Sequence, residues 1–365
     1  MDSNDLSFEK SSLESLGWSD SFARQVADGE RAGRVASANH GRFLVWTADG
    51  EVDASVTGVL RKSGGLWPAV GDWVVLKPDG AVIERVLERR TKLSRKQPER
   101  EVREQVLAAN VDVLFIVSGL DRDYNPRRIE RFLVMATESG ARPVVLLNKA
   151  DLAAELNLDL VGIVADIQQL QAGLTVLPIS AKADEDLDAL PAQLGPAQTA
   201  ALIGSSGVGK STILNRLLGD ERQRTTAVRA SDSRGRHTTT TRQLFRMPGG
   251  RLLPEGWLLM DLPGLREVQL WSNAEQPTQN LEASFDDIQA LAQNCRFRDC
   301  THGAEPGCAV MAAALDPARL ANFQKMQREL ASLERRTSPK LAKETRAKGK
   351  AIEKSVRQHP KRDSS

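Results

Sequence analysis

The stretch that decides the fold of this chain reads Gly204-Ser205-Ser206-Gly207-Val208-Gly209-Lys210-Ser211. It fits G-x-x-x-x-G-K-[ST] and lies between an apolar run at 200–203 and a segment of helical spacing that begins near Lys210. Glycines let backbone N–H groups turn inward around phosphate oxygens, and a helix N-terminus adds its positive dipole end. The stretch therefore predicts a phosphate-binding loop in which Lys210 reaches the β- and γ-phosphates and Ser211 ligates Mg²⁺. A glycine-rich turn that merely contains a lysine is the alternative.

The segments around this loop alternate between strand and helix patterns. Four apolar runs are typical of strands buried on both faces of a sheet, at residues 111–117, 143–147, 175–179 and 200–203. Helical spacing separates them at 127–139 and 159–170. This alternation predicts an α/β domain whose parallel sheet carries helices on both faces.

Two further motifs each follow a predicted strand and concern the base of the nucleotide. Asn148-Lys149-Ala150-Asp151 fits N-K-x-D, and Ser180-Ala181-Lys182 offers the second half of a guanine pocket. A carboxylate at Asp151 can accept both guanine N1–H and the exocyclic amine, whereas adenine has neither donor there. N-K-x-D alone is short and arises by chance, but together with the phosphate loop it predicts GTP rather than ATP.

The magnesium side of the site is predicted from two stretches after the loop. Asp261-Leu262-Pro263-Gly264 follows an apolar strand at 257–260 and fits D-x-x-G, so Asp261 would hold Mg²⁺ while the Gly264 N–H meets the γ-phosphate. A threonine-rich stretch lies between the phosphate loop and D-x-x-G, and we expect Thr239 in it to complete the Mg²⁺ shell. The stretch reads Gly235-Arg236-His237-Thr238-Thr239-Thr240-Thr241. An ordinary strand is the alternative for part of this threonine run.

These motifs define a complete predicted set of ligands. The expected magnesium ligands are Ser211, Thr239 and Asp261. The expected GTP-binding residues are Asn148, Lys149, Asp151, Ser180, Ala181, Lys182, Gly204, Ser205, Ser206, Gly207, Val208, Gly209, Lys210, Ser211, Thr212 and Gly264.

The order of the motifs differs from that of ordinary small G proteins, which begin with the phosphate loop. Here N-K-x-D and S-A-K come first, and the loop, the threonine run and D-x-x-G follow. Because the motifs sit at or near the ends of parallel strands, cutting and rejoining the chain can leave the site intact. The second switch then leads directly into the C-terminal module, and a γ-phosphate-dependent movement near Asp261 could pull on that module. Unchanged contacts of the module in GTP- and GDP-bound structures would count against this hypothesis.

A small β-barrel is predicted before the nucleotide domain, from about Gly33 to Glu88. Short strand patterns at 42–47, 52–60, 72–76 and 81–87 are separated by turn dipeptides such as Asp49-Gly50. A closed barrel of the OB-fold kind is the commonest solution of this size, and an SH3-like barrel is the alternative. The basic stretch 89–96 that follows is expected to contact RNA phosphates in a salt-sensitive manner.

The three cysteines of the chain are Cys295, Cys300 and Cys308, and with His302 they form the pattern Cys-x₄-Cys-x-His-x₅-Cys. An odd number in one short stretch does not fit a disulfide framework, and C-x-x-C is absent. A Cys₃His set suits one tetrahedral, structural Zn²⁺; unrelated reduced thiols are the alternative. A helical stripe at 318–336 is expected to be packed core or a partner-facing helix.

Length and charge complete the predicted organisation of the 365 residues. We expect an N-terminal extension at 1–30, the RNA-binding barrel at 31–95, the GTPase domain at 96–275, the zinc module at 276–336 and a basic tail at 337–365 whose composition predicts disorder. No apolar run approaches the roughly 20 residues of a membrane span, and the N-terminus lacks the order of a secretory signal. We therefore expect a cytoplasmic protein with no membrane partner, and nothing requires more than a monomer.

The chain resembles the RsgA (YjeQ) family of circularly permuted GTPases from the barrel to about Ala314. Besides the motif order, the resemblance rests on Ala109-Asn110-Val111-Asp112, on the glycine-histidine-threonine stretch at 235–240 and on the cysteine segment 295–310. It implies an OB-fold, a GTPase domain and a zinc domain. It also implies that GTP is hydrolysed to GDP and phosphate under stimulation by the small (30S) ribosomal subunit and its rRNA, late in the maturation of that subunit.

The position of the usual water-orienting residue differs from that of common G proteins. A glutamine usually follows D-x-x-G, but Leu265 stands there and cannot hydrogen-bond through its side chain. We expect His237 to take this catalytic role beside Lys210, as the resemblance supports; a histidine that orders the loop or contacts RNA is the alternative. A non-catalytic GTP-gated RNA-binding assembly scaffold, and a permuted GTPase serving the large subunit, are the competing functions.

Overall fold

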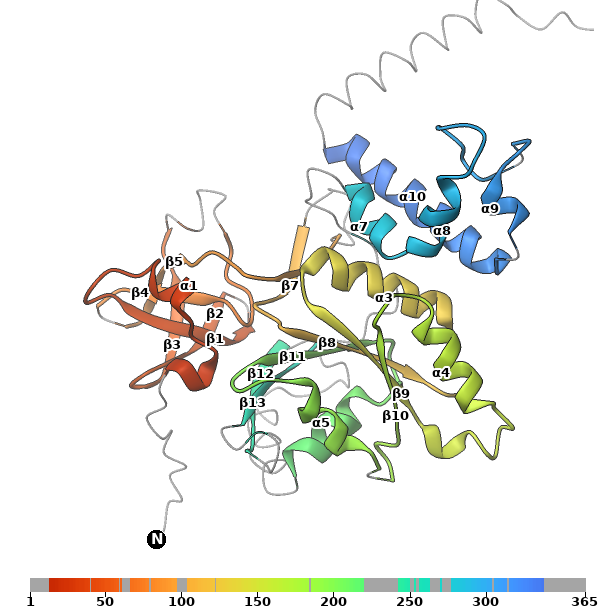
Figure 1. The fold of residues 1–365 in the computed structure, drawn as a ribbon. Helices are drawn as coiled ribbons and strands as arrows, with labels where there is room; N and C mark the ends of the chain where they lie inside the picture. The colour runs from red at the N-terminus through yellow and green to blue at the C-terminus, as the bar shows by residue number, and fades with distance from the viewer. Residues whose placement is uncertain are drawn as a thin grey trace, which may run out of the picture. The chain divides into compact units, whose positions relative to one another are not determined.

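A computed structural model describes most of the chain. The described residues are 13–39, 41–58, 60, 66–78, 80–96, 104–121, 123–183, 185–219, 242–249, 253, 256–262, 270, 277–303, 305–313 and 315–337. The chain divides into two compact units, one of residues 1–94 with 106–268 and the other of 95–105 with 269–365. The first contains the barrel and the nucleotide domain (Figure 1). The second contains the cysteines.

The first unit begins with a closed five-stranded barrel, preceded by the short helices η1 (Leu13–Leu16) and α1 (Asp20–Ala23). Its strands are β1 (Arg31–Asn39), β2 (Arg42–Thr47), β3 (Gly50–Val56), β4 (Trp73–Leu76) and β5 (Val82–Val86). They pair in the order β1-β2-β3-β5-β4, and the antiparallel pairing of β4 with β1 closes the ring. Alternate residues such as Val35, Val45 and Val74 fill the interior. The predicted barrel is confirmed.

The nucleotide domain is built on a mainly parallel sheet. The parallel strands are β8 (Val113–Gly119), β9 (Arg142–Asn148), β10 (Thr175–Ile179), β11 (Thr199–Gly204) and β13 (Trp257–Asp261), and β12 (Arg242–Met247) is antiparallel to β13. The spatial order is β10-β9-β8-β11-β13-β12. Every residue of β8 and β11 is buried, which explains why these strands are continuous apolar runs. The parallel sheet predicted from them is confirmed.

Helices cover both faces of this sheet. Helices α3 (Pro126–Ser139) and α4 (Leu160–Gln168) lie on one face and α5 (Lys210–Leu218) on the other (Figure 1). Short 3₁₀ helices occur at η2 (Ala150–Leu152), η3 (Leu187–Ala189) and η4 (Pro191–Gln193). Helix α5 begins at Lys210, so the end of the glycine-rich turn is the helix N-terminus that the phosphate loop requires.

The barrel and the nucleotide domain share one eleven-stranded sheet, because β1 also pairs with β12. A buried arginine reinforces the junction: Arg34 donates to the carbonyl oxygens of Leu16, Gly71 (3.3 Å) and Asn110 (3.1 Å). Gly71 has φ +90°, and a Cβ there would lie 2.1 Å from the carbonyl oxygen of Ala109. Only glycine allows this close approach of the two backbones.

The basic stretch after the barrel is partly structural. Strands β6 (Lys92–Lys96) and β7 (Glu104–Ala109) form a two-stranded sheet. Arg89 donates two 2.7 Å hydrogen bonds to the carboxylate of Asp72, and their side chains are 6% and 0% exposed. A buried carboxylate needs such a partner. The prediction that the whole stretch 89–96 contacts RNA phosphate is therefore wrong for Arg89.

The second unit contains helices α7 (Pro277–Ala283), α8 (Asp286–Ala292), α9 (Ala309–Ala312) and α10 (Pro317–Thr337). The rings of Phe285 and Phe323 pack 5.2 Å apart, and Arg319 joins Asp287 through hydrogen bonds of 2.8 and 2.7 Å. The buried stripe of α10 comprises Phe323, Met326, Leu330 and Leu333. This stripe is core, as one of the two interpretations of its spacing predicts.

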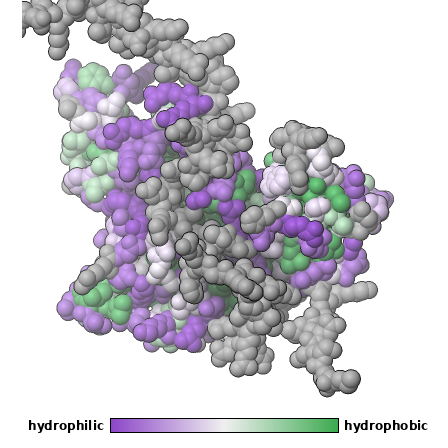
Figure 2. Space-filling model, turned by 180° about the vertical axis from the view of Figure 1, so that it is seen from behind, coloured by the Kyte–Doolittle hydropathy of each residue, from purple (hydrophilic) through white to green (hydrophobic). Residues whose placement is uncertain are grey.

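Hydrophilic residues predominate among the described residues on the face drawn in Figure 2, and hydrophobic ones occur there in small groups. Within the described ranges, no helix has the length and apolar character needed to cross a membrane.

Candidate nucleotide site and metal centre

The phosphate loop connects the end of β11 to the start of α5. Gly209, the residue before the helix, has φ +103°, and a Cβ there would lie 2.1 Å from the side-chain nitrogen of Asn148. The loop can therefore touch the N-K-x-D motif only with glycine at this position. Ser211 and Thr212 are exposed in the first turn of the helix, where their hydroxyls are open to a ligand.

Lys210 and Asp261 are the buried charges of the site. The Lys210 ammonium donates to the carbonyl oxygens of Gly204 (3.0 Å) and Ser205 (2.7 Å). Burial lowers the pKa of Lys210, and the charge of Asp261 opposes that shift. Burial raises the pKa of Asp261 to about 6, and Lys210 opposes this shift in turn. Both groups are 8% exposed, and such buried charges are typical of a site completed by a charged ligand.

Asn148 joins the three motifs that the sequence places far apart. Its side-chain nitrogen donates to the carbonyl oxygen of Val208 (2.7 Å), and its side-chain oxygen accepts from the N–H of Ala181 (3.0 Å). The Ser180 hydroxyl donates to the carboxylate of Asp151. The two halves of the predicted guanine pocket are therefore in contact with each other and with the phosphate loop.

The two lysines of these motifs lie in different surroundings. The Lys149 ammonium donates to the carbonyl oxygen of Gly207 (3.1 Å) and to the carboxylate of Asp121. The carbonyl oxygen of Lys182 accepts from Arg216 of α5 (3.1 Å). Through its backbone, the S-A-K motif is thus tied to the helix that follows the phosphate loop.

The predicted switch residues lie outside the described part of the chain. These are the expected catalyst His237, the expected magnesium ligand Thr239, and Gly264, which was expected at the γ-phosphate; Leu265 and the connection from D-x-x-G to the C-terminal module are also outside it. Of the three expected magnesium ligands, the described residues include Ser211 and Asp261.

Three polar residues next to the phosphate loop were missed by the sequence analysis. Asp121, Asp123 and Arg128 belong to the connection from β8 to α3 and to the first turn of that helix. Asp121 follows an apolar strand just as Asn148 follows the next one, and the carboxyl ends of adjacent parallel strands meet at one edge of a sheet. That placement was a usable signal for Asp121. Arg128 has no comparable signal, because its role depends on how the helix is placed.

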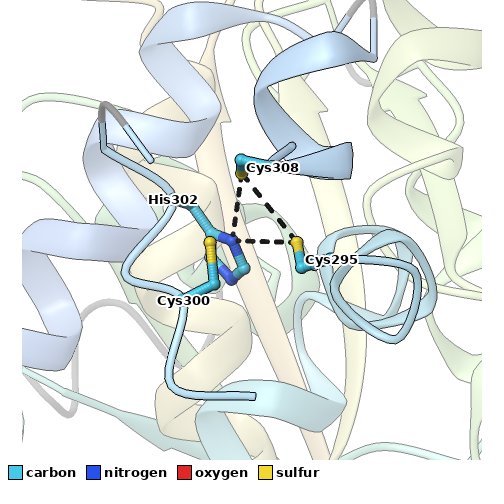
Figure 3. A group of neighbouring side chains, drawn as sticks. All are labelled: Cys295, Cys300, His302 and Cys308. Atoms are coloured by element: carbon cyan, nitrogen blue, oxygen red, sulfur yellow. Dashed lines mark hydrogen bonds between the residues drawn. The ribbon is translucent and has the colours of Figure 1, made fainter. Parts of the chain in front are cut away.

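The four predicted metal ligands form one cluster (Figure 3). The Nδ1 atom of His302 lies 3.7 Å from the Cys295 sulfur and 3.6 Å from the Cys308 sulfur, and these sulfurs are 3.9 Å apart. With Cys300 included, all four ligand atoms lie within 4.8 Å of one another. Bond lengths of about 2.3 Å to sulfur and 2.0 Å to nitrogen separate tetrahedral zinc ligands by roughly 3.5–3.8 Å. The donor set and its spacing therefore fit a tetrahedral Zn²⁺ ion.

Hydrogen bonds hold the chain around this cluster. The carboxylate of Glu305 accepts from the N–H groups of Thr301 (2.9 Å) and Gly303 (2.8 Å), and hydrogen bonds from Thr301 foremost lower the pKa of Glu305 to about 2. From α10, the Gln324 amide donates to the carbonyl oxygens of Thr301 (3.2 Å) and His302 (2.8 Å). The N–H of Met311 donates to the Cys308 sulfur (3.4 Å). The contacts of Glu305 and Gln324 fix the loop that carries His302.

A phosphate loop at the end of a parallel strand, joined to guanine motifs that precede it in the chain, defines a P-loop GTPase domain with circularly permuted motif order. The family described as RsgA GTPase matches residues 86–271. This chain belongs to the RsgA GTPase family, and it is a GTP hydrolase.

Relatives and solved structures agree with this assignment. "Small ribosomal subunit biogenesis GTPase RsgA" of Opitutus terrae is 43% identical over 363 residues, which cover 93% of this chain and 95% of the relative. A protein of the same description from Xanthomonas campestris is 44% identical over 77% of this chain and 74% of its own length. The crystal structure of YjeQ from Thermotoga maritima has a TM-score of 0.59 and 26% identity, covering 83% of this chain and 99% of that one. The circularly permuted GTPase YloQ, at 23% identity, shares the fold with a TM-score of 0.56 over 84% of this chain and 96% of that one.

Proposed function

We propose that this chain hydrolyses GTP to GDP and phosphate when it binds the small ribosomal subunit, and that it acts late in the maturation of the 30S subunit in the cytoplasm. The observation that carries the proposal is the double contact of Asn148, which joins the guanine motifs to the phosphate loop. The descriptions of the relatives as small ribosomal subunit biogenesis GTPases support the choice of partner.

The roles of the nucleotide-binding residues follow from their chemistry. Asp151, held by the Ser180 hydroxyl, would accept the N1–H and amine of guanine. The Lys210 ammonium would exchange the carbonyl oxygens of Gly204 and Ser205 for β- and γ-phosphate oxygens. Ser211 and Asp261 would hold Mg²⁺, which when bound neutralises charge on the phosphates.

The remaining roles fall on the switch residues. We propose that Thr239 completes the magnesium ligands, that the Gly264 N–H meets the γ-phosphate, and that His237 orients the attacking water because Leu265 cannot. A site whose water-orienting group is on a switch loop hydrolyses GTP slowly until a partner orders that loop. This would explain why GTP hydrolysis depends on binding to the ribosomal subunit.

The barrel would bind rRNA, and a zinc ion would stabilise the C-terminal module. In this proposal the barrel and the basic residues that follow Arg89 contact rRNA phosphates. One structural zinc ion, held by Cys295, Cys300, His302 and Cys308, orders the second unit. The protein acts as a monomer.

The first experiment measures GTP hydrolysis by the full chain alone and with purified small subunits, large subunits or naked rRNA. We expect strong stimulation by small subunits alone. Stimulation by large subunits alone would assign the protein to the other subunit. Tight GTP binding with no turnover under any condition would make it a GTP-gated scaffold.

A second experiment tests the proposed catalyst. His237→Ala should remove most of the stimulated hydrolysis while leaving GTP affinity within about twofold of the wild type, because a water-orienting group acts on the chemical step. Asp188→Ala, an exposed substitution in the nucleotide domain outside the motifs, is the matched control and should change neither quantity. Full stimulated turnover in His237→Ala would rule out the catalytic role.

A further inference from the structure

A closed ring of hydrogen bonds joins the start of α3 to the phosphate loop. Arg128 Nη1 donates to Ser205 Oγ (2.9 Å) and to Asp123 Oδ2 (2.6 Å), and Arg128 Nη2 donates to Asp123 Oδ1 (3.2 Å). Ser205 Oγ in turn donates to Asp123 Oδ2 (2.7 Å). The Ser205 hydroxyl thus donates once and accepts once within the ring, which we call the Ser205 clasp.

The local sequence builds the clasp. Asn125 caps α3 by accepting from the N–H groups of Arg127 (2.9 Å) and Arg128 (3.3 Å), and Pro126 occupies the first helical position. Arg128 is therefore held in the first turn of the helix. The N–H of Asp123 donates to Asp121 Oδ1 (3.0 Å), which fixes the other member of the ion pair.

The same connection holds the phosphate loop at two points. The clasp binds Ser205, near the start of the loop. Asp121 binds the Lys149 ammonium, which also donates to the carbonyl oxygen of Gly207 in the middle of the loop. Two separate attachments to one short, capped connection restrict how far the loop can open.

The clasp also acts on the residue that holds Lys210. The carbonyl oxygen of Ser205 accepts from the Lys210 ammonium (2.7 Å), and Ser205 is 7% exposed. In the nucleotide-free site, fixing Ser205 therefore fixes the place of the lysine that is proposed to bind the phosphates. Arg128 additionally neutralises the Asp123 carboxylate, which would otherwise repel phosphate from the edge of the loop.

We propose that Asp123 and Arg128 are positioning residues that hold the phosphate loop in its nucleotide-binding form through Ser205 and so slow the release of GDP. This inference rests on the proposed function, because it assumes that the loop binds guanine nucleotides. It concerns the lifetime of the bound nucleotide rather than the chemical step.

The test measures the dissociation rate of a fluorescent GDP from the full chain by stopped flow. Ser205→Ala removes the hydroxyl but keeps the Arg128–Asp123 ion pair, and we expect release to be at least about tenfold faster, the effect of a lost hydrogen bond to a charged group. Arg128→Ala should accelerate release at least as much, because it also leaves Asp123 uncompensated. The matched control is Arg42→Ala, which breaks the exposed Arg42–Asp53 pair on the barrel and should leave the rate unchanged.

The double variant Ser205→Ala/Arg128→Ala separates positioning from a general loss of stability. If the clasp is one unit, the double variant releases GDP no faster than Arg128→Ala alone, whereas independent damage multiplies the two effects. Multiplying effects, or an unchanged rate in Ser205→Ala, would overturn the proposal. Neither result bears on the proposed function, which is tested separately by subunit-stimulated GTP hydrolysis. A wild-type chain that does not bind GDP would contradict both proposals.

Discussion

The nucleotide site and the cysteine cluster are two ligand sites built in opposite ways. The nucleotide site stands at the ends of parallel strands, and its Asn148, Lys210 and Asp261 side chains are all less than 10% exposed. The cysteine cluster lies among loops and the short helices α8 and α9, of seven and four residues, and Cys295 and Cys300 are only half-buried. Apolar burial thus holds the first site without its ligand, whereas we expect the second to depend on the ion that its four ligands would bind.

Loss of the metal gives the largest effect that this comparison predicts. Zinc bound at a structural Cys₃His site contributes on the order of 10 kcal/mol to folding. We expect Cys308→Ser, or treatment with a zinc chelator, to expose residues 277–337 to protease while GTP binding by the first unit persists. Limited proteolysis and circular dichroism measure the first result and nucleotide titration the second. Met311→Ala, at an exposed neighbour, is the control. An unchanged proteolysis pattern would show that the second unit does not need its metal.

Substitution in the guanine pocket should be the largest effect at the nucleotide site. Asp151→Asn removes the acceptor that we propose for guanine N1–H and the amine, and discrimination of this kind is about 10⁴-fold, or roughly 5 kcal/mol. We expect GTP affinity to fall by that order while xanthosine triphosphate, which offers a carbonyl instead of the amine, binds better. Calorimetric titration checks both, with the exposed Asp188→Asn as control. Equal loss of both nucleotides would argue against the assigned contact.

Removal of the phosphate-loop lysine should affect binding but not folding. Lys210→Met deletes charge-assisted hydrogen bonds to the phosphates, and we expect GTP affinity to fall about 100-fold to 1000-fold. The unfolding free energy of the nucleotide-free protein should change by less than about 2 kcal/mol, because removal of a buried ammonium offsets the loss of a donor to two carbonyl oxygens. Denaturant titration measures this. A much larger loss of unfolding free energy would mean that apolar burial alone does not hold the nucleotide site without its ligand.

The smallest effect concerns the support of the metal loop by α10. Gln324→Ala removes the donors to the carbonyl oxygens of Thr301 and His302, and outer-shell losses of this kind cost about 10-fold to 100-fold in metal affinity. Competition with a coloured zinc chelator measures that affinity. Lys325→Ala, at the next and exposed position of the helix, should leave it unchanged. Equal zinc affinities for the two variants would show that the ion alone, without the Gln324 contacts, holds the loop in place.

The barrel shows where reading along the chain falls short. Strand patterns at 42–47, 72–76 and 81–87 predict β2, β4 and β5 closely, because alternation and turn dipeptides are local signals. Strand β1 (Arg31–Asn39) was not among the clear patterns, since arginine, glycine and serine interrupt its alternation. Those residues serve contacts that are distant in sequence: β1 pairs with β2, β4 and β12, and Arg34 reaches the start of the nucleotide domain.

The sequence by itself determined the phosphate loop, the guanine motifs, their permuted order, the buried parallel strands and the spacing of the four metal ligands. Each of these depends on residue type and spacing within one short segment, where the chemistry is local. Only the tertiary structure decided that Asp72 neutralises Arg89, that the barrel and the nucleotide domain share one sheet, and that Arg128 donates a hydrogen bond to Ser205. Those contacts join residues 17, 204 to 206 and 77 positions apart, and their partners are chosen by the packing of whole elements, which no local pattern encodes.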